Sequence, residues 1–135
     1  MKMARIKYSE LNSRQKENYN FQKVAGELAD YGYNCLRLND DWQGADFLAV
    51  HVNGEDVLKV QLKGRFTIDQ KYVGKDIYIA FLDDDDCYLY PHDEVMTHVL
   101  SLEKINNSKS WKQSQAYSWP YLSKWAKHLL TEYKI

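Results

Sequence analysis

The sequence has few cysteines, no long apolar run and no excess of either charge. Cys35 and Cys87 fall in apolar or strand-like settings and form no CxxC pattern, so we expect buried free thiols rather than a disulfide or zinc site. Such thiols indicate a reducing, cytoplasmic location. No segment approaches the roughly 20 apolar residues that span a bilayer, and the polar start MKMARIKYSELNSR lacks the apolar core of a signal peptide. No membrane partner is expected.

The charge balance excludes a protein that attracts polyanions through its whole surface. Eighteen Lys and Arg residues against nineteen Asp and Glu leave a formal charge of -1, so any contact with nucleic acid must come from a local patch. The chain has no internal repeat and no low-complexity linker. With 135 residues, 44% of them hydrophobic, it is long enough for one well-packed domain, which we assign to residues 1–135.

Hydrophobic periodicity predicts a helix from about Arg14 to Tyr31, followed by several strands. Ser13 is the expected N-cap and Gly32 the expected end of this helix. Its core-facing stripe consists of Phe21, Val24, Ala25, Leu28 and Ala29. Strands are predicted at residues 33–38, 45–52, 56–66, 77–83 and 87–91, with Asn53-Gly54 as a tight hairpin turn.

The remainder of the chain is predicted to be mostly helical, with one long loop. Helices are expected at residues 92–102 and 120–133, and residues 103–118 are expected to form a polar surface loop. The four aspartates at 83–86 lack the spacing of a calcium loop and indicate a solvated turn. His92 is a secondary candidate for a phosphate contact.

Polar residues gather on the two strands around Asn53-Gly54. Asp46 begins the first of these strands, and the two-residue period of the second places Lys59, Gln61 and Lys63 on one face. An acid, an amide and an ammonium can therefore converge at one sheet edge. The alternative is that Asp46 caps a strand and the alternation marks an ordinary solvent-facing strand.

This arrangement resembles the PD-(D/E)XK nuclease superfamily over about residues 14–102. In that family a helix precedes a mixed sheet, an Asp begins the second strand and an acid-x-Lys triplet lies on the third. Asp46 matches the Asp and Gln61-Leu62-Lys63 matches the triplet, with Gln61 in place of the acid as in small QxK endonucleases. The resemblance implies an α/β, restriction-endonuclease-like fold: a mixed, mostly antiparallel sheet of about five strands flanked by helices, with residues 103–135 as a C-terminal loop and helix.

The resemblance also implies a Mg²⁺-dependent DNA endonuclease that hydrolyses phosphodiester bonds. Asp46, Gln61 and the Leu62 backbone carbonyl would hold Mg²⁺, for which Mn²⁺ can substitute, because hard cations prefer oxygen ligands. Lys63 would assist the attacking water and neutralise charge on the phosphate. The family's additional helix ligand would be Gln22 as first choice or Glu17 as second. Duplex or branched DNA is the expected partner, and a homodimer the expected assembly.

Basic and aromatic side chains near these strands are candidate nucleic-acid contacts. They are Trp42, Lys59, Arg65, Lys71 and Lys75. Two other functions remain open from the sequence. One is a catalytically inactive nuclease-fold protein that binds nucleic acid or protein, which the loss of the acid at Gln61 favours. The other is an assembly protein whose aromatic surface binds a partner.

Overall fold

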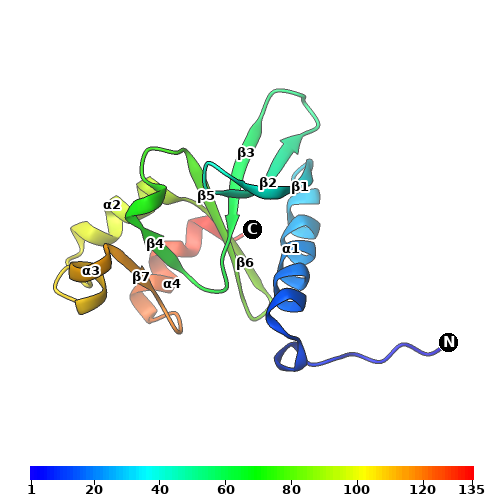
Figure 1. Ribbon diagram of the computed structural model, residues 1–135, viewed down its shortest axis with the longest axis horizontal. Coiled ribbons are helices and arrows are strands. Elements are labelled where there is room, and N and C mark those ends of the chain that lie inside the picture. Colours follow the sequence, from blue (N-terminus) through cyan, green and yellow to red (C-terminus); the bar gives the residue numbers. More distant parts are fainter.

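A five-stranded mixed sheet lies at the centre of the computed structural model, which describes residues 1–135 (Figure 1). The strand order is β1-β2-β3-β5-β6, and every neighbouring pair is antiparallel except β3 and β5. The strands are β1 (Tyr33–Trp42), β2 (Ala45–His51), β3 (Val57–Leu62), β5 (Ile77–Asp83) and β6 (Asp86–Pro91). The predicted fold class, a mostly antiparallel sheet flanked by helices, is confirmed.

Helix α1 (Ser13–Ala29) covers one face of this sheet because its apolar stripe can bury there. Val24 and Leu28 are buried against Phe47, Ala49 and Val60 of the sheet. The N-cap is Asn12, not Ser13: the Asn12 side chain accepts a hydrogen bond from the Gln15 N–H, and the Gln15 side chain accepts one from the Asn12 N–H. This capping box starts the helix one residue earlier than predicted.

The hairpin turns differ from those predicted in length and position. Strand β1 continues beyond residue 38 to Trp42, and Gln43-Gly44, with φ values of 51° and 87°, forms a two-residue turn into β2. The Asn53-Gly54 connection is longer than two residues, because β2 ends at His51 and β3 begins at Val57. There the Asn53 side chain accepts hydrogen bonds from the N–H groups of Glu55 and Asp56, which favours a wider turn.

The other face of the sheet carries the larger apolar core, formed with α2 (His92–Ser101) and α4 (Lys124–Leu130) (Figure 1). Helix α4 begins at Lys124, not at Pro120. The preceding chain is held elsewhere, because buried Trp119 stacks on Phe66 at a centroid distance of 4.1 Å and donates its N–H to the Phe66 carbonyl. None of the helices combines the length and the apolar character that crossing a bilayer requires.

The predicted loop at 103–118 is wrong, because this segment contains a helix and a strand. Helix α3 (Lys109–Ser114) leads into β7 (Ala116–Ser118), which pairs antiparallel with β4 (Thr67–Asp69) in a second small sheet. Strands of three residues carry no readable period, so local pattern could not reveal them. Short 3₁₀ turns complete the chain: η1 (Tyr8–Glu10), η2 (Gln70–Tyr72) and η3 (Thr131–Tyr133).

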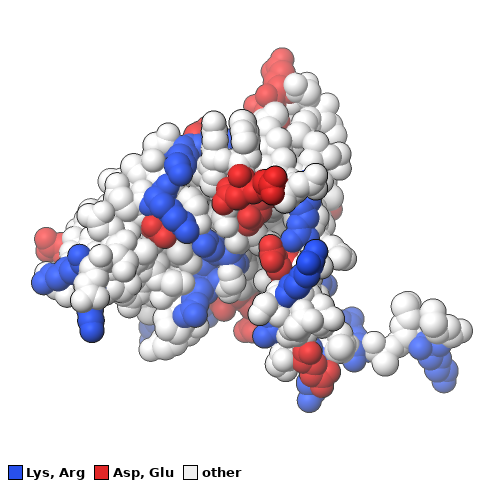
Figure 2. Space-filling view, in the orientation of Figure 1, with Lys and Arg blue, Asp and Glu red and all other residues white.

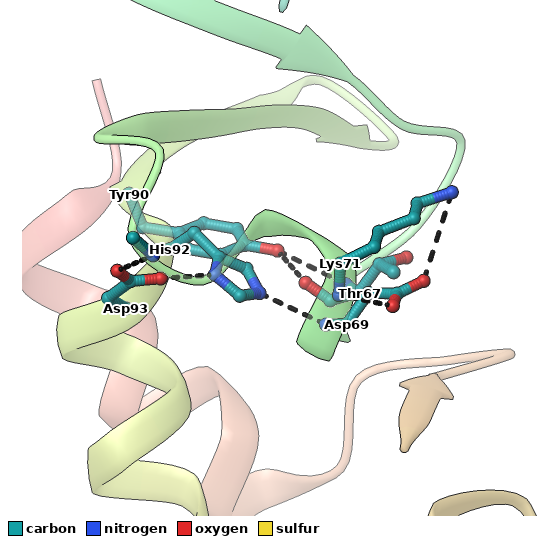
Figure 3. A network of polar contacts seen from close by, with 7 residues as sticks. Thr67, Asp69, Lys71, Tyr90, His92 and Asp93 are labelled. Atoms are coloured by element: carbon teal, nitrogen blue, oxygen red, sulfur yellow. Dashed lines mark hydrogen bonds and ion pairs between the residues drawn. The ribbon is translucent and has the colours of Figure 1, made fainter. Parts of the chain in front are cut away.

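A buried polar network joins β4 to β6 and α2 (Figure 3). The Asp69 N–H donates to His92 Nε2 at 3.0 Å, so the ring proton resides on Nδ1, which donates to Asp93 at 2.9 Å. The Tyr90 hydroxyl accepts from the Thr67 N–H and donates to the Thr67 carbonyl. Because His92 is fully buried, it cannot contact a phosphate, and that expectation is wrong.

We expect His92→Ala to lower the free energy of unfolding by about 3 kcal/mol. The change leaves the Asp69 N–H without its acceptor and opens a cavity in a fully buried position. Urea unfolding followed by far-UV circular dichroism measures the loss. His98→Ala is the matched control: His98 is exposed on the same helix, so its removal should change stability by less than about 0.5 kcal/mol. Equal effects of the two changes would contradict the structural role of His92.

Two further features of the sequence take the expected form. Both cysteines are free thiols, but only Cys87 is fully buried, whereas Cys35 is half-buried. Burial raises the pKa of Cys87 to about 12, so this thiol is unreactive at neutral pH. The aspartate run forms the β5–β6 turn, in which Asp84, Asp85 and Asp86 are exposed.

Candidate metal and nucleic-acid site

Asp46 lies where the first residues of β2 meet the last residues of β3. The Gln43-Gly44 turn ends immediately before β2 and delivers Asp46 to this position. Asp46 Oδ2 accepts a hydrogen bond of 2.9 Å from the Leu62 N–H. The carboxylate therefore replaces a backbone acceptor at the end of the β2–β3 pairing. This hydrogen bond fixes Oδ2 and leaves Oδ1 without a protein donor.

The end of β3 supplies the amide and the ammonium. Gln61 Oε1 is buried and has no hydrogen-bond partner. Lys63 follows the strand, is half-buried, and places Nζ 5.5 Å from the centroid of the Tyr72 ring. Asp46, Gln61, Leu62 and Lys63 line one cavity of about 370 Å³, here called the site cavity. The structure thus brings together the three residues that the sequence predicts as the reaction centre.

The Leu62 backbone is oriented toward Asp46. The Ala80 carbonyl of β5 accepts a hydrogen bond from the Lys63 N–H. Because consecutive residues of a strand direct their backbone groups to opposite sides, the N–H and carbonyl of Leu62 point away from β5. The Leu62 N–H confirms that orientation by donating to Asp46. The carbonyl of Leu62 consequently leaves β3 on the side where the Asp46 carboxylate lies.

Helix α1 contributes Glu17, and not Gln22, to this region. Glu17 lines the site cavity and also a neighbouring cavity of about 810 Å³, here called the acidic cavity, which is lined by Asp40, Asp41 and Asp46 as well. Gln22 is exposed and lines neither. The sequence contained the signal for Glu17: with Phe21, Val24 and Leu28 it recurs at i, i+4, i+7 and i+11, so it extends the core-facing stripe toward Asp46.

Glu17 is held in place by Arg37 of β1. The Arg37 guanidinium forms an ion pair with Glu17 at 3.3 Å, donates a hydrogen bond to Asn18 and lies 5.1 Å from the Phe21 ring centroid. Arg37 is therefore engaged with α1. Its role here is to position a carboxylate at the border of both cavities.

The charge environment of Asp46 favours a bound cation. Burial raises the pKa of the Asp46 carboxyl; the hydrogen bond from Leu62 opposes this effect, the charges of Asp41 and Glu17 add to it, and Lys63 opposes it. The net result is a pKa above the ordinary value. Because the charges of Asp41 and Glu17 disfavour ionisation of Asp46, a cation bound beside Asp46 would relieve the cost of ionising it.

The donors available for a metal are mixed in type. The structure contains no group of three or more His, Cys, Asp or Glu side chains close enough to hold a metal ion. A metal at this place would therefore depend on the Gln61 amide and a backbone carbonyl besides carboxylate oxygen. Oxygen donors of this kind suit Mg²⁺ or Mn²⁺ and are poor ligands for softer metals.

Basic side chains surround the acidic centre. Figure 2 shows Asp and Glu atoms in the middle of this face, with Lys and Arg atoms on both sides. We call Lys59, Arg65, Lys71 and Lys75 the basic rim. Arg65 is exposed and lines a cavity with Lys63, and Lys59 Nζ lies 3.5 Å from Gln43 Oε1.

The other members of the predicted contact surface are also exposed. Lys71 Nζ lies 3.9 Å from Asp69 and 5.1 Å from the Tyr72 ring centroid, and Lys75 is exposed in the same connection. Trp42, at the end of β1, exposes 52% of its surface. Sequence reasoning missed Tyr8, Lys16 and Asn20, which also line the site cavity. Of these, Asn20 follows Glu17 by three residues, a helical spacing that places both on one face.

The order of the elements defines the class of fold. A helix precedes an antiparallel three-strand meander, and a fourth strand runs parallel to the third and pairs with a fifth. This is the restriction-endonuclease-like architecture that the sequence predicts, with Asp46 on the second strand and Gln61 and Lys63 at the end of the third.

The chain has a partial likeness to two solved structures. No protein-family model matches the sequence, and no curated protein matches it. The structure is similar to that of a bacterial homing endonuclease, I-Ssp6803I, with a TM-score of 0.47 and 20% identity, covering 62% of this chain and 67% of the other. It is also similar to Hjc, a Holliday junction resolvase of the archaeal hyperthermophile Archaeoglobus fulgidus, with a TM-score of 0.42 and 15% identity, covering 55% and 76%. Values this low transfer no residue roles, so function is argued from the site itself.

Proposed function

We propose that the protein is a metal-dependent DNA endonuclease whose reaction centre consists of Asp46, Gln61 and Lys63. The observation that carries the proposal is the buried, unpartnered Oε1 of Gln61, a residue that lines the same cavity as Asp46. A buried acceptor without a partner costs about 1–3 kcal/mol. A divalent cation beside the carboxylates would satisfy this oxygen.

The residues present fit Mg²⁺. Asp46 offers Oδ1, because Oδ2 already accepts from Leu62. Gln61 offers Oε1, and the Leu62 carbonyl leaves the strand on the same side. Glu17 adds a second carboxylate from α1. These four oxygen donors, two of them from carboxylates, would hold the ion and leave further positions for water and a phosphate oxygen. Mn²⁺ accepts the same donors.

Each group at the site has a separate role in phosphodiester hydrolysis. Bound Mg²⁺ would supply Lewis-acid stabilisation of the negative charge that develops on the phosphate. Lys63 places an ammonium in the same cavity, where it orients the attacking water and neutralises a non-bridging phosphate oxygen. The Tyr72 ring, 5.5 Å from Nζ, restricts where this ammonium can lie. The Leu62 N–H holds Asp46 in the orientation that ligation needs.

The proposed substrate is duplex or branched DNA. Lys59 lies on β3 and Trp42 at the end of β1, and the rest of the basic rim lies in the connections that follow β3 and β4. These side chains can bind phosphates, and the exposed Trp42 ring can stack on an unpaired base. Because one reaction centre cuts one strand, cleavage of both strands calls for two copies, and we propose a symmetric homodimer as the active form.

The test is a cleavage assay on supercoiled plasmid, four-way branched DNA and single-stranded DNA. The purified protein should convert at least one of them when Mg²⁺ or Mn²⁺ is added, and EDTA should stop the reaction. A folded protein that cuts none of these substrates with either metal would overturn the proposed activity. DNA binding without cleavage would then favour the second candidate, a nuclease-fold binding module, which is consistent with the neutral amide at Gln61.

Replacing Gln61 by Glu should lower the Mg²⁺ concentration that gives half-maximal cleavage by about tenfold. A charged ligand gains roughly 1.4 kcal/mol more than a neutral one, which is a factor of about ten in affinity. Isothermal titration of the metal measures the same change without DNA. Gln22→Glu, on the exposed surface of α1, is the matched control and should leave the metal affinity unchanged. If the Gln22 variant binds metal more tightly and the Gln61 variant does not, the site is misassigned.

A further inference from the structure

We propose that residues 1–7, called the arm, bind the phosphate backbone of the DNA that enters the site cavity. The inference rests on the proposed function, because it names how the same substrate is held. Figure 1 shows the arm as an extended segment that leaves the molecule next to the start of α1. Its side chains have no packing partner in the body: Met3 is 91% exposed and Ile6 63% exposed.

The arm concentrates positive charge that the remaining chain lacks. It contains Lys2, Arg5 and Lys7 and no acidic residue. The formal charge of -1 therefore divides into +3 on the arm and -4 on residues 8–135. DNA approaching the body alone would meet a net negative protein, with positive potential confined to the basic rim. The arm more than triples the local positive charge per residue compared with the chain as a whole, so it favours association with a polyanion.

The arm is attached at the mouth of the site cavity. Its last residue precedes Tyr8, which is fixed to α1: Asn20 Nδ2 donates to the Tyr8 hydroxyl at 3.0 Å, and the rings of Tyr8 and Tyr19 meet edge to face at 5.2 Å. Lys16 Nζ lies 5.3 Å from the Tyr8 ring centroid. Tyr8, Lys16 and Asn20 all line the site cavity with Asp46 and Lys63. The arm thus joins the body next to a residue that lines the cavity where the scissile phosphate is proposed to bind.

The length of the arm suits this role. Seven extended residues reach about 23 Å. Each strand of duplex DNA carries one phosphate per roughly 3.4 Å of the helix axis, so the arm can follow a stretch with about seven phosphates on one strand. The apolar side chains between its cations would also suit contact with a second copy of the chain. The position beside the reaction centre favours DNA, and the experiment separates the two occupants.

The experiment measures DNA affinity by fluorescence anisotropy in EDTA, over a series of salt concentrations, for the full-length protein and two triple variants. The arm variant carries Lys2→Gln, Arg5→Gln and Lys7→Gln. The control carries Lys104→Gln, Lys124→Gln and Lys127→Gln, which remove the same charge from exposed residues that line neither the site cavity nor the acidic cavity.

The arm variant should bind at least about tenfold more weakly near 0.1 M salt, and the slope of log affinity against log salt should fall by about 0.9 for each lost phosphate contact. The control should change affinity less than about threefold. Equal losses in both variants, or unchanged affinity in the arm variant, would overturn the arm's role and leave the proposed endonuclease standing. A changed sedimentation coefficient with unchanged DNA affinity would assign the arm to a second copy instead. A native protein that neither binds nor cuts DNA would overturn both proposals together.

Discussion

Asp46→Asn will abolish metal-dependent cleavage and, at the same time, raise the melting temperature of the metal-free protein. The amide keeps an oxygen that accepts from the Leu62 N–H but removes the charge that ligation needs. Metal ions supply several kcal/mol of transition-state stabilisation, so the cleavage rate should fall on the order of 10³-fold.

The gain in stability follows from the raised pKa of Asp46. Burial raises this pKa, and Asp41 and Glu17 raise it further. A carboxyl whose pKa is higher in the folded than in the unfolded state destabilises the fold as pH rises through the interval between the two values. Asn removes that cost. The difference in melting temperature between the variant and the native protein should be small below the ordinary Asp pKa of about 3.9 and grow toward neutral pH.

Calorimetry without metal and plasmid cleavage with Mg²⁺ measure the two effects of Asp46→Asn. Asp84→Asn is the control: Asp84 is exposed in the β5–β6 turn, where Asn tolerates the positive φ of 52°, and neither stability nor cleavage should change measurably. An Asp46→Asn protein that cuts at the native rate would exclude this carboxylate from the reaction. A lowered melting temperature would contradict the electrostatic account.

Lys63→Met will lower the cleavage rate by about 10²- to 10⁴-fold while Mg²⁺ affinity stays the same or increases slightly. Proton transfer and positioning by a side chain contribute rate factors of this size. Met keeps the apolar stem that packs near Tyr72 and removes only the ammonium. Metal affinity should not fall, because Lys63 is not a ligand and its positive charge opposes a nearby cation.

The distinction between rate and metal binding is the diagnostic result for Lys63. Single-turnover cleavage at saturating DNA and Mg²⁺ reports the chemical step, and calorimetric titration reports the metal. Lys23→Met is matched in geometry, because Lys23 Nζ lies 5.4 Å from the Tyr19 ring centroid as Lys63 Nζ does from Tyr72, yet it lines neither cavity with Asp46. A loss of metal binding in Lys63→Met would mean that the substitution disturbs the site rather than removing a catalytic group.

The parts of the fold that the sequence predicts are those with a clear local period. The continuous apolar run of Ile77–Asp83 predicts a buried strand with bounds identical to those of β5, and the stripe of α1 places that helix within two residues at both ends. Asp46, Gln61 and Lys63 could be brought together from sequence because a hairpin fixes which residues of two neighbouring strands face one another.

Other features depended on contacts that no local pattern records. Strands β4 and β7 pair across a separation of 51 residues between Thr67 and Ser118, and each is only three residues long. The role of His92 also depends on a contact distant in sequence, because its Nε2 accepts a hydrogen bond from the Asp69 N–H of β4. Counting back from the end of the helix favours Gln22 over Glu17, whereas the rotation of the apolar stripe favours Glu17.

The small β4–β7 sheet also affects the order in which the chain folds. Closing a loop of about 50 residues for three ladder pairs gives little enthalpy for a large entropic cost, so this closure follows the formation of the central sheet. Lys63 and Arg65, which follow β3, share a cavity with Ser118 of the small sheet. We expect the reaction centre around Asp46 to be complete while this adjoining surface is still open, which makes the approach to the site the last part of the molecule to acquire its final shape.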